Sequence, residues 1–111
     1  MLRFVTLAAI VCAFSLGAHA QGYPTRPVKL VVADAAGGAP DQLARLVAEK
    51  LSPGLGQQVV VENRAGAAGA LGAELVAKAP PDGHTLLMTT SAIYALLPNL
   101  RKDLPYDPAK D

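Results

Sequence analysis

Three short apolar runs constrain this fold more than any other feature of the chain. They cover residues 28–33 (VKLVVA), 58–62 (QVVVE) and 85–90 (TLLMTT). The length and β-branched residues of the first run are typical of a strand that is buried on both faces, and the other two runs predict further short strands. Parallel neighbours need a long connection between them, and the segments between these runs are long enough for helices. The sequence therefore predicts an α/β fold, with β-α-β-α-β order and helices on the faces of a parallel sheet.

The segment between the first two runs has the period of an amphipathic helix. Pro40 suits a first helical turn, and Asp41 follows where the helix dipole favours an acid. We expect a helix over residues 40–51, ended by the Pro-Gly-rich stretch 53–56. Its apolar stripe is expected to face the sheet, and comprises Leu43, Leu46, Val47, Leu51 and Leu55.

The rest of the chain predicts a second helix and a less regular end. A glycine-rich loop, residues 63–72, opens the second helix. The apolar stripe of that helix comprises Leu71, Leu75, Val76 and Ala79. Residues 91–97 suit a short helix stopped by Pro98, because proline ends helical patterns. The polar, proline-punctuated segment 101–111 is expected to lie over the surface.

Composition excludes several classes of protein. The chain has 111 residues, which supports one domain at most, and 51% hydrophobic with 17% charged residues excludes a disordered protein. Its net charge of +1 without a basic run lacks the footprint of a nucleic-acid partner. One cysteine excludes a disulfide scaffold and a multi-cysteine zinc site.

The first twenty residues have the pattern of a secretory signal peptide. Arg3 supplies a positive start, an apolar stretch follows, and Ala18-His19-Ala20 ends it with small residues around one larger one. We expect cleavage after Ala20 and a periplasmic mature chain. An uncleaved membrane anchor is the alternative, but a span needs roughly 20 apolar residues and this stretch is shorter.

Three segments are predicted to meet beyond the carboxyl ends of the strands, where open parallel sheets bind ligands. Two of them open helices, whose N-terminal amides and dipole attract anions, and the third offers hydroxyl groups. A small carboxylate is the obvious ligand for such an edge. The candidate binding residues are Ala36, Gly37, Gly38 and Asp41, then Ala67, Ala68 and Gly69, and finally Thr90 and Ser91.

Other polar residues leave alternatives open, and none completes a catalytic site. Asp41 suits a helix first turn as well as a ligand contact, and Arg64 suits either a carboxylate partner or solvent. His84 falls at the opposite end of its strand and is interpreted as structural or exposed. Ser91 has no GxSxG context, and no dinucleotide or GK[ST] phosphate loop occurs. We therefore expect no enzyme activity, no cofactor and no metal.

The runs YPTRPVKLVV, AAGGAPDQLARLVAEKL, GQQVVVENRAGAAGALGAELVAKAPPDGHTLL and LPYDP resemble the Bug family. These proteins are the extracytoplasmic solute receptors of tripartite tricarboxylate transporters. The resemblance implies a two-domain periplasmic binding-protein fold, a small organic acid held between the domains, and a monomer that serves membrane subunits of the transporter. It also places ligand contacts at residues 36–38 with Asp41, at 67–69, and at Thr90 and Ser91.

The chain departs from the family pattern at some positions and in length. Asp34 stands where a large apolar residue is usual, which suggests either a ligand with a cationic or donor group or neutralisation by a neighbour such as Arg64. On this resemblance we expect residues 21–111 to correspond to the N-terminal part of the first domain, without the second domain. We therefore expect these residues alone to bind ligand poorly. The alternative is a receptor fragment or relic that neither transports nor binds.

Overall fold

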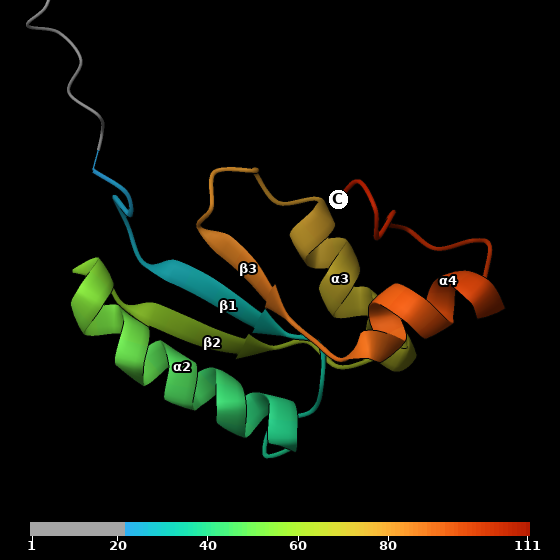
Figure 1. Cartoon of the computed structure of the whole chain (residues 1–111), viewed down its shortest axis with the longest axis horizontal. Helices are drawn as coiled ribbons and strands as arrows, with labels where there is room; N and C mark the ends of the chain where they lie inside the picture. Colours follow the sequence, from blue (N-terminus) through green and yellow to red (C-terminus); the bar gives the residue numbers. More distant parts are fainter. Residues whose placement is uncertain (1–21) are drawn as a thin grey trace, which may run out of the picture.

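The computed structural model describes residues 22–111, and the predicted signal peptide, residues 1–20, lies outside them. Strands and helices alternate along the described chain (Figure 1). In order they are β1 (Val28–Val32), α2 (Ala39–Leu55), β2 (Val59–Asn63), a 3-10 turn η2 (Ala67–Gly69), α3 (Ala70–Ala77), β3 (Thr85–Met88), a π-helical segment η3 (Ala92–Leu96) and α4 (Leu97–Leu100).

The three strands form one sheet in the order β2-β1-β3. Both pairs are parallel, with Val28 opposite Val59 in one and Lys29 opposite Thr85 in the other. The prediction of a parallel α/β sheet is confirmed. Because β1 lies in the centre, its valines are the most deeply buried part of the sheet: Val28, Val31 and Val32 have no exposed surface.

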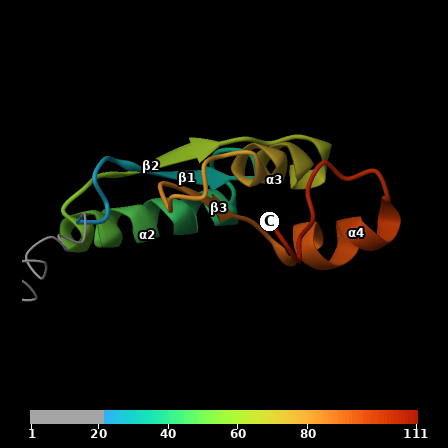
Figure 2. The ribbon, with the colours of Figure 1, turned by 90° about the horizontal axis from the view of Figure 1, so that it is seen from above.

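Each face of the sheet carries its own apolar cluster. Figure 2 shows α2 on one side of the strands. On one face, α2 packs its Ala44 and Ala48 against Val28, Leu30 and Val32. On the other face, α3, η3, α4 and the C-terminal segment surround Ala33. That second cluster comprises Ala33, Ala70, Ala73, Ile93, Leu97 and Tyr106. Side chains alternate between the two faces along β1, as strand geometry requires.

The predicted apolar stripe of the first helix was largely wrong. Leu43 and Leu46 are each 53% exposed and Leu51 is 44% exposed, whereas the buried positions of α2 are Asp41, Ala44 and Ala48. Small alanines bring the helix close to the sheet, so the larger leucines lie beside the contact rather than in it. The helix also runs four residues past the expected end at 51, through Pro53 to Leu55, and Gly56 closes it with a left-handed φ of 65°.

The C-terminal third departs from prediction in three further ways. Pro98 does not stop a helix; it lies in the first turn of α4, where the missing N–H is not needed. The segment 101–111 is not purely superficial, because Tyr106 is 9% exposed and packs in the second cluster. β3 ends at Met88, so Thr89 and Thr90 form a connection rather than strand. Within residues 22–111, no helix is long and apolar enough to cross a membrane.

Candidate functional site

The carboxyl ends of the three parallel strands point to one edge of the sheet, and the predicted site residues follow them (Figure 1). Ala36, Gly37 and Gly38 lie between β1 and α2, and all three are exposed. Ala67 and Ala68 are exposed, whereas Gly69 is buried. Thr90 and Ser91 lie exposed between β3 and η3.

A hydrogen bond to Asp41 fixes the first loop, which contains Ala36, Gly37 and Gly38. The Gly37 amide donates a hydrogen bond of 2.8 Å to Asp41 Oδ2, and the Gln42 side chain donates to the Gly37 carbonyl at 3.1 Å. Gly37 has a φ of 87°, which glycine adopts without the clash that a Cβ would cause. The Gly37 amide is therefore occupied within the chain and is not free for a ligand.

Asp41 itself is buried, with only 3% of its surface exposed. Besides Gly37, its carboxylate accepts hydrogen bonds from Arg45 Nε at 3.1 Å and from Asn63 Nδ2 at 3.0 Å. These bonds, that from Gly37 first, lower the pKa of Asp41 to about 2. Both carboxylate oxygens have hydrogen-bond partners in the chain, so Asp41 shapes the first loop.

The second loop has a strained backbone. Gly66, Ala67, Ala68 and Gly69 have φ values of 132°, 49°, 55° and 90°, so two alanines adopt a conformation that side chains other than glycine rarely adopt. Such residues cost on the order of 1–3 kcal/mol each and are concentrated at ligand sites. The Gly69 amide donates to the Gly66 carbonyl at 2.9 Å. Ala67 and Ala68 thus remain as the exposed residues of this turn at the start of α3.

Hydrogen bonds and close packing bring the three segments together. The Arg64 amide donates to the Val32 carbonyl at 2.8 Å, and Asn63 Nδ2 donates to the Asp34 carbonyl at 3.3 Å, which joins the first two loops. The second loop packs on η3 so closely that a Cβ on Gly69 would lie 2.5 Å from Ile93 Cδ1. The three predicted binding segments therefore lie next to one another.

Charged residues near this edge are largely paired with one another. Arg64 pairs with Glu62, which also binds Lys29 Nζ at 2.8 Å. The hydrogen bond from Lys29, with a smaller contribution from Arg64, lowers the pKa of Glu62. Among the described ion pairs, the partner of Arg64 is thus Glu62 and not Asp34.

His84 lies at the other end of the sheet and is buried, at 6% exposure. Its Nε2 accepts a hydrogen bond from the Thr25 amide at 3.2 Å, and its Nδ1 lies 3.2 Å from the Asp82 carbonyl. Tyr23 packs edge-on against the ring, with centroids 5.0 Å apart. These contacts fit the structural interpretation, because they hold the N-terminal segment on the turn before β3. No cluster of three or more potential metal ligands occurs within residues 22–111.

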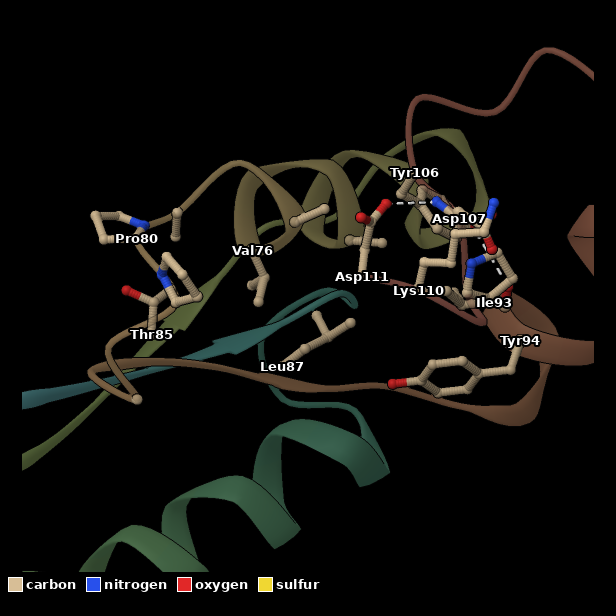
Figure 3. Close-up of a pocket in the computed structure, with 16 residues that line it drawn as sticks. Val76, Pro80, Thr85, Leu87, Ile93, Tyr94, Tyr106, Asp107, Lys110 and Asp111 are labelled. Carbon is tan, nitrogen blue, oxygen red and sulfur yellow. Dashed lines mark hydrogen bonds and ion pairs between the residues drawn. The ribbon is translucent and has the colours of Figure 1, made fainter.

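One groove in the described part of the chain does not coincide with the predicted edge. It has a volume of about 430 Å³ and runs along β3 between α3 and the C-terminal segment (Figure 3). Val76, Leu87 and Tyr94 line it, with Asp107 and Lys110 at one end. None of the predicted binding residues lines this groove. It lies beside β3, an edge strand of the described sheet, whose outer backbone groups have no partner strand there.

Asn63 is the site residue that the sequence did not single out. It ends β2, and its amide contacts the Asp34 carbonyl, Asp41 and Arg45 at once. The available signal was a polar residue at the carboxyl end of a parallel strand, directly before a glycine-rich loop. The pattern of apolar residues carries no information on which side chain such an amide will contact.

Comparison with known proteins identifies the family. Residues 43–111 match the model of the tripartite tricarboxylate transporter family receptor. A UPF0065 protein of Bordetella bronchiseptica is 46% identical over 112 residues, which cover 100% of this chain and 33% of that protein. Among solved structures, the periplasmic binding protein BugD is 46% identical with a TM-score of 0.73, and covers 78% of this chain and 28% of its own.

A second solved structure was determined with a ligand. MatC of Rhodopseudomonas palustris with bound malate is 41% identical with a TM-score of 0.75, over 79% of this chain and 30% of that one. The present chain thus spans about a third of the length of the relatives it matches. The family match, the identity and the shared fold agree, and the chain belongs to the tripartite tricarboxylate transporter receptor family.

Proposed function

We propose that this chain contributes one wall of a binding site for a small carboxylate, in a periplasmic receptor that serves a tripartite tricarboxylate transporter. The observation that carries the proposal is the pair of exposed, positive-φ alanines, Ala67 and Ala68, at the start of α3. Strained backbone of this kind is concentrated at ligand sites, and a helix N-terminus favours an anion. The malate bound to MatC supports a carboxylate as the ligand class.

Two neighbouring features support the same assignment. The hydroxyl groups of Thr90 and Ser91 lie on the segment that packs beside Gly69, where they can donate to a carboxylate oxygen. The nearby Arg64 is paired with Glu62, so the site would hold its ligand through dipoles rather than through a salt bridge. A receptor role also accounts for the expected signal peptide, since the ligand is collected outside the cytoplasm. On this proposal the chain binds and does not catalyse.

On the same proposal, this chain alone binds the carboxylate ligand with low affinity. Ligand sites normally bury most of their ligand in a cleft, and the residues of this edge form only one side. The described residues therefore correspond to part of a first domain, with the opposite wall supplied by the longer part that the relatives have. We expect dissociation constants on the order of millimolar, or about −4 kcal/mol of binding free energy. The functional chain is proposed to act as a monomer towards the membrane subunits.

Nuclear magnetic resonance titration tests this proposal, because it detects weak binding residue by residue. Malate added to the purified, isotope-labelled chain should shift the amides of Ala67, Ala68, Thr90 and Ser91. The amide of Gly54, at the far end of α2, is the internal control and should not move. The diamide of malic acid, which has the same size without the charges, should produce no shift. Malate-dependent shifts confined to the groove along β3, or none at all, would contradict the proposal.

A further inference from the structure

Buried Asp41 and half-buried Asn63 form a polar pair that links the first proposed ligand loop to the end of β2. Asp41 Oδ1 accepts from Asn63 Nδ2 at 3.0 Å, while Oδ2 of the same carboxylate accepts from the Gly37 amide. Asn63 Nδ2 also donates to the Asp34 carbonyl at 3.3 Å. The pair therefore connects the first loop to the last residue of β2, from which the second loop begins.

Hydrogen bonds explain how the charged carboxylate of Asp41 can be buried at this position. Burying a carboxylate is unfavourable unless hydrogen bonds and an opposite charge replace its water. Asp41 has three hydrogen bonds, and one of them comes from Arg45, whose side chain is 57% exposed. Arg45 Nη2 also donates to Asn63 Oδ1 at 3.3 Å. All of these groups satisfy one another's hydrogen bonds, so Asp41 and Asn63 form a fixed pair that braces the loop. The charge of Asp41 is paired and is not a free anion that would repel a carboxylate ligand.

We propose that Asp41 and Asn63 are positioning residues that set the relative placement of the two ligand loops, and hence carboxylate affinity, without contacting the ligand. This inference rests on the proposed function. It assigns to Asp41 a different task from the ligand contact that the sequence suggested. It also assigns a task to Asn63, which the sequence left unnoticed.

The polarity of the pair predicts how substitutions behave. In Asp41→Asn, an amide replaces one carboxylate oxygen, and two NH2 groups then face each other between residues 41 and 63. In Asn63→Asp, two carboxylates face each other, and like charges repel. When both changes are combined, the residue 41 amide donates to the residue 63 carboxylate, and its oxygen still accepts from Gly37. Arg45 Nη2 keeps an acceptor at residue 63.

The experiment is a malate titration, followed by nuclear magnetic resonance, of the purified chain and these three variants. Each single change should weaken malate binding about tenfold, since a charge-assisted hydrogen bond is lost or replaced by repulsion. The double exchange should recover part of the affinity, because the hydrogen bond between residues 41 and 63 returns while the Asp34 carbonyl still lacks its donor. Glu49→Gln is the matched control, because Glu49 is an acid on the same helix whose side chain is 72% exposed. It should bind malate as the wild type does.

The possible results separate this inference from the proposed function. Equal malate affinity in the wild type and both folded single variants would overturn the positioning role, as would a double variant no better than the single ones. A loss of stability without a change in affinity would also overturn it, because a purely structural brace gives that result. If the wild-type chain shows no malate-dependent shift, the proposed function fails and the positioning role falls with it. Slow hydrogen exchange at the Gly37 amide, lost in Asp41→Asn, would then still identify the brace as structural.

Discussion

Gly72 packs directly against Ala33, with no room for a side chain between them. A Cβ on Gly72 would lie 2.9 Å from Ala33 Cβ and 3.1 Å from the Arg64 carbonyl oxygen. Gly72 belongs to α3 and Ala33 directly follows β1, so this contact sets how closely the helix approaches the sheet. The spacing positions the start of α3, where the proposed ligand loop lies.

Gly72→Ala should therefore destabilise the chain, although alanine is the better helix former. The overpacked methyl group must push α3 away from the sheet, which costs about 1–3 kcal/mol and outweighs the gain of about 1 kcal/mol in helix propensity. Urea unfolding measures the difference. Gly54→Ala is the matched control, since Gly54 also lies in a helix but a Cβ there meets nothing within 4 Å. That variant should be as stable as the wild type or more stable.

The Tyr106 hydroxyl makes a buried hydrogen bond that anchors the C-terminal segment. It donates to the Ile93 carbonyl at 3.0 Å, and burial raises the pKa of the Tyr106 phenol. Tyr106→Phe should lower the free energy of unfolding by about 1 kcal/mol or more, because the carbonyl loses its partner away from water. Tyr94→Phe is the control, since Tyr94 is 50% exposed. Equal unfolding midpoints for the two variants would show that the hydroxyl contributes nothing.

Asp41 should make stability depend on pH in the acid range. Hydrogen bonds from Gly37, then Arg45 and Asn63, lower its pKa in the folded chain from 3.8 to about 2. The unfolded chain therefore takes up this proton first, so the stabilisation is complete above about pH 4 and is lost as the pH falls towards 2. Urea unfolding of the wild type and Asp41→Asn at several pH values tests this. The stability difference between them should shrink across that window; a difference that stays constant would contradict it.

The alternation of strands and helices was predictable because it rests on runs of residues with strong patterns. The valines of β1 are buried on both faces, and a continuous apolar run indicates that directly. The side of α2 that faces the sheet was not predictable in the same way. Ala44 and Ala48 pack on the sheet while Leu43 and Leu46 stay exposed, because the contact selects small residues for close approach. A hydrophobicity pattern ranks leucine above alanine and so selects the wrong side.

The location of the site was predictable from the sequence, but its hydrogen bonds and backbone conformation were not. Parallel topology alone brings the three loops to one edge, and the glycines mark where they turn. The sequence left Asp41 open between a helix first-turn residue and a ligand contact, and its hydrogen bonds to Gly37 and Asn63 favour the first. The positive φ of Ala67 and Ala68 was also not predictable, because alanine normally avoids it. Such departures from local preference depend on tertiary contacts.

Gly69 joins the ligand loop to the segment that carries the hydroxyl groups, so its substitution should affect stability and binding together. Gly69 has a φ of 90°, and a Cβ there would lie 2.5 Å from Ile93 Cδ1 and 3.2 Å from the Ala33 carbonyl oxygen. Gly69→Ala must therefore strain the backbone and displace the Ile93 side chain of η3 from the loop. We expect a loss of about 2 kcal/mol or more in unfolding free energy.

The same substitution should abolish the malate-dependent amide shifts at Ser91, since its hydroxyl would no longer lie beside the loop. Gly37→Ala is an informative comparison. Gly37 has a similar φ of 87°, but a Cβ there meets nothing within 4 Å. This variant should have backbone strain alone, with a cost of about 1–2 kcal/mol and unchanged contact between the loop and η3. If both variants kept full malate binding, the contact between Gly69 and Ile93 would have no part in shaping the site.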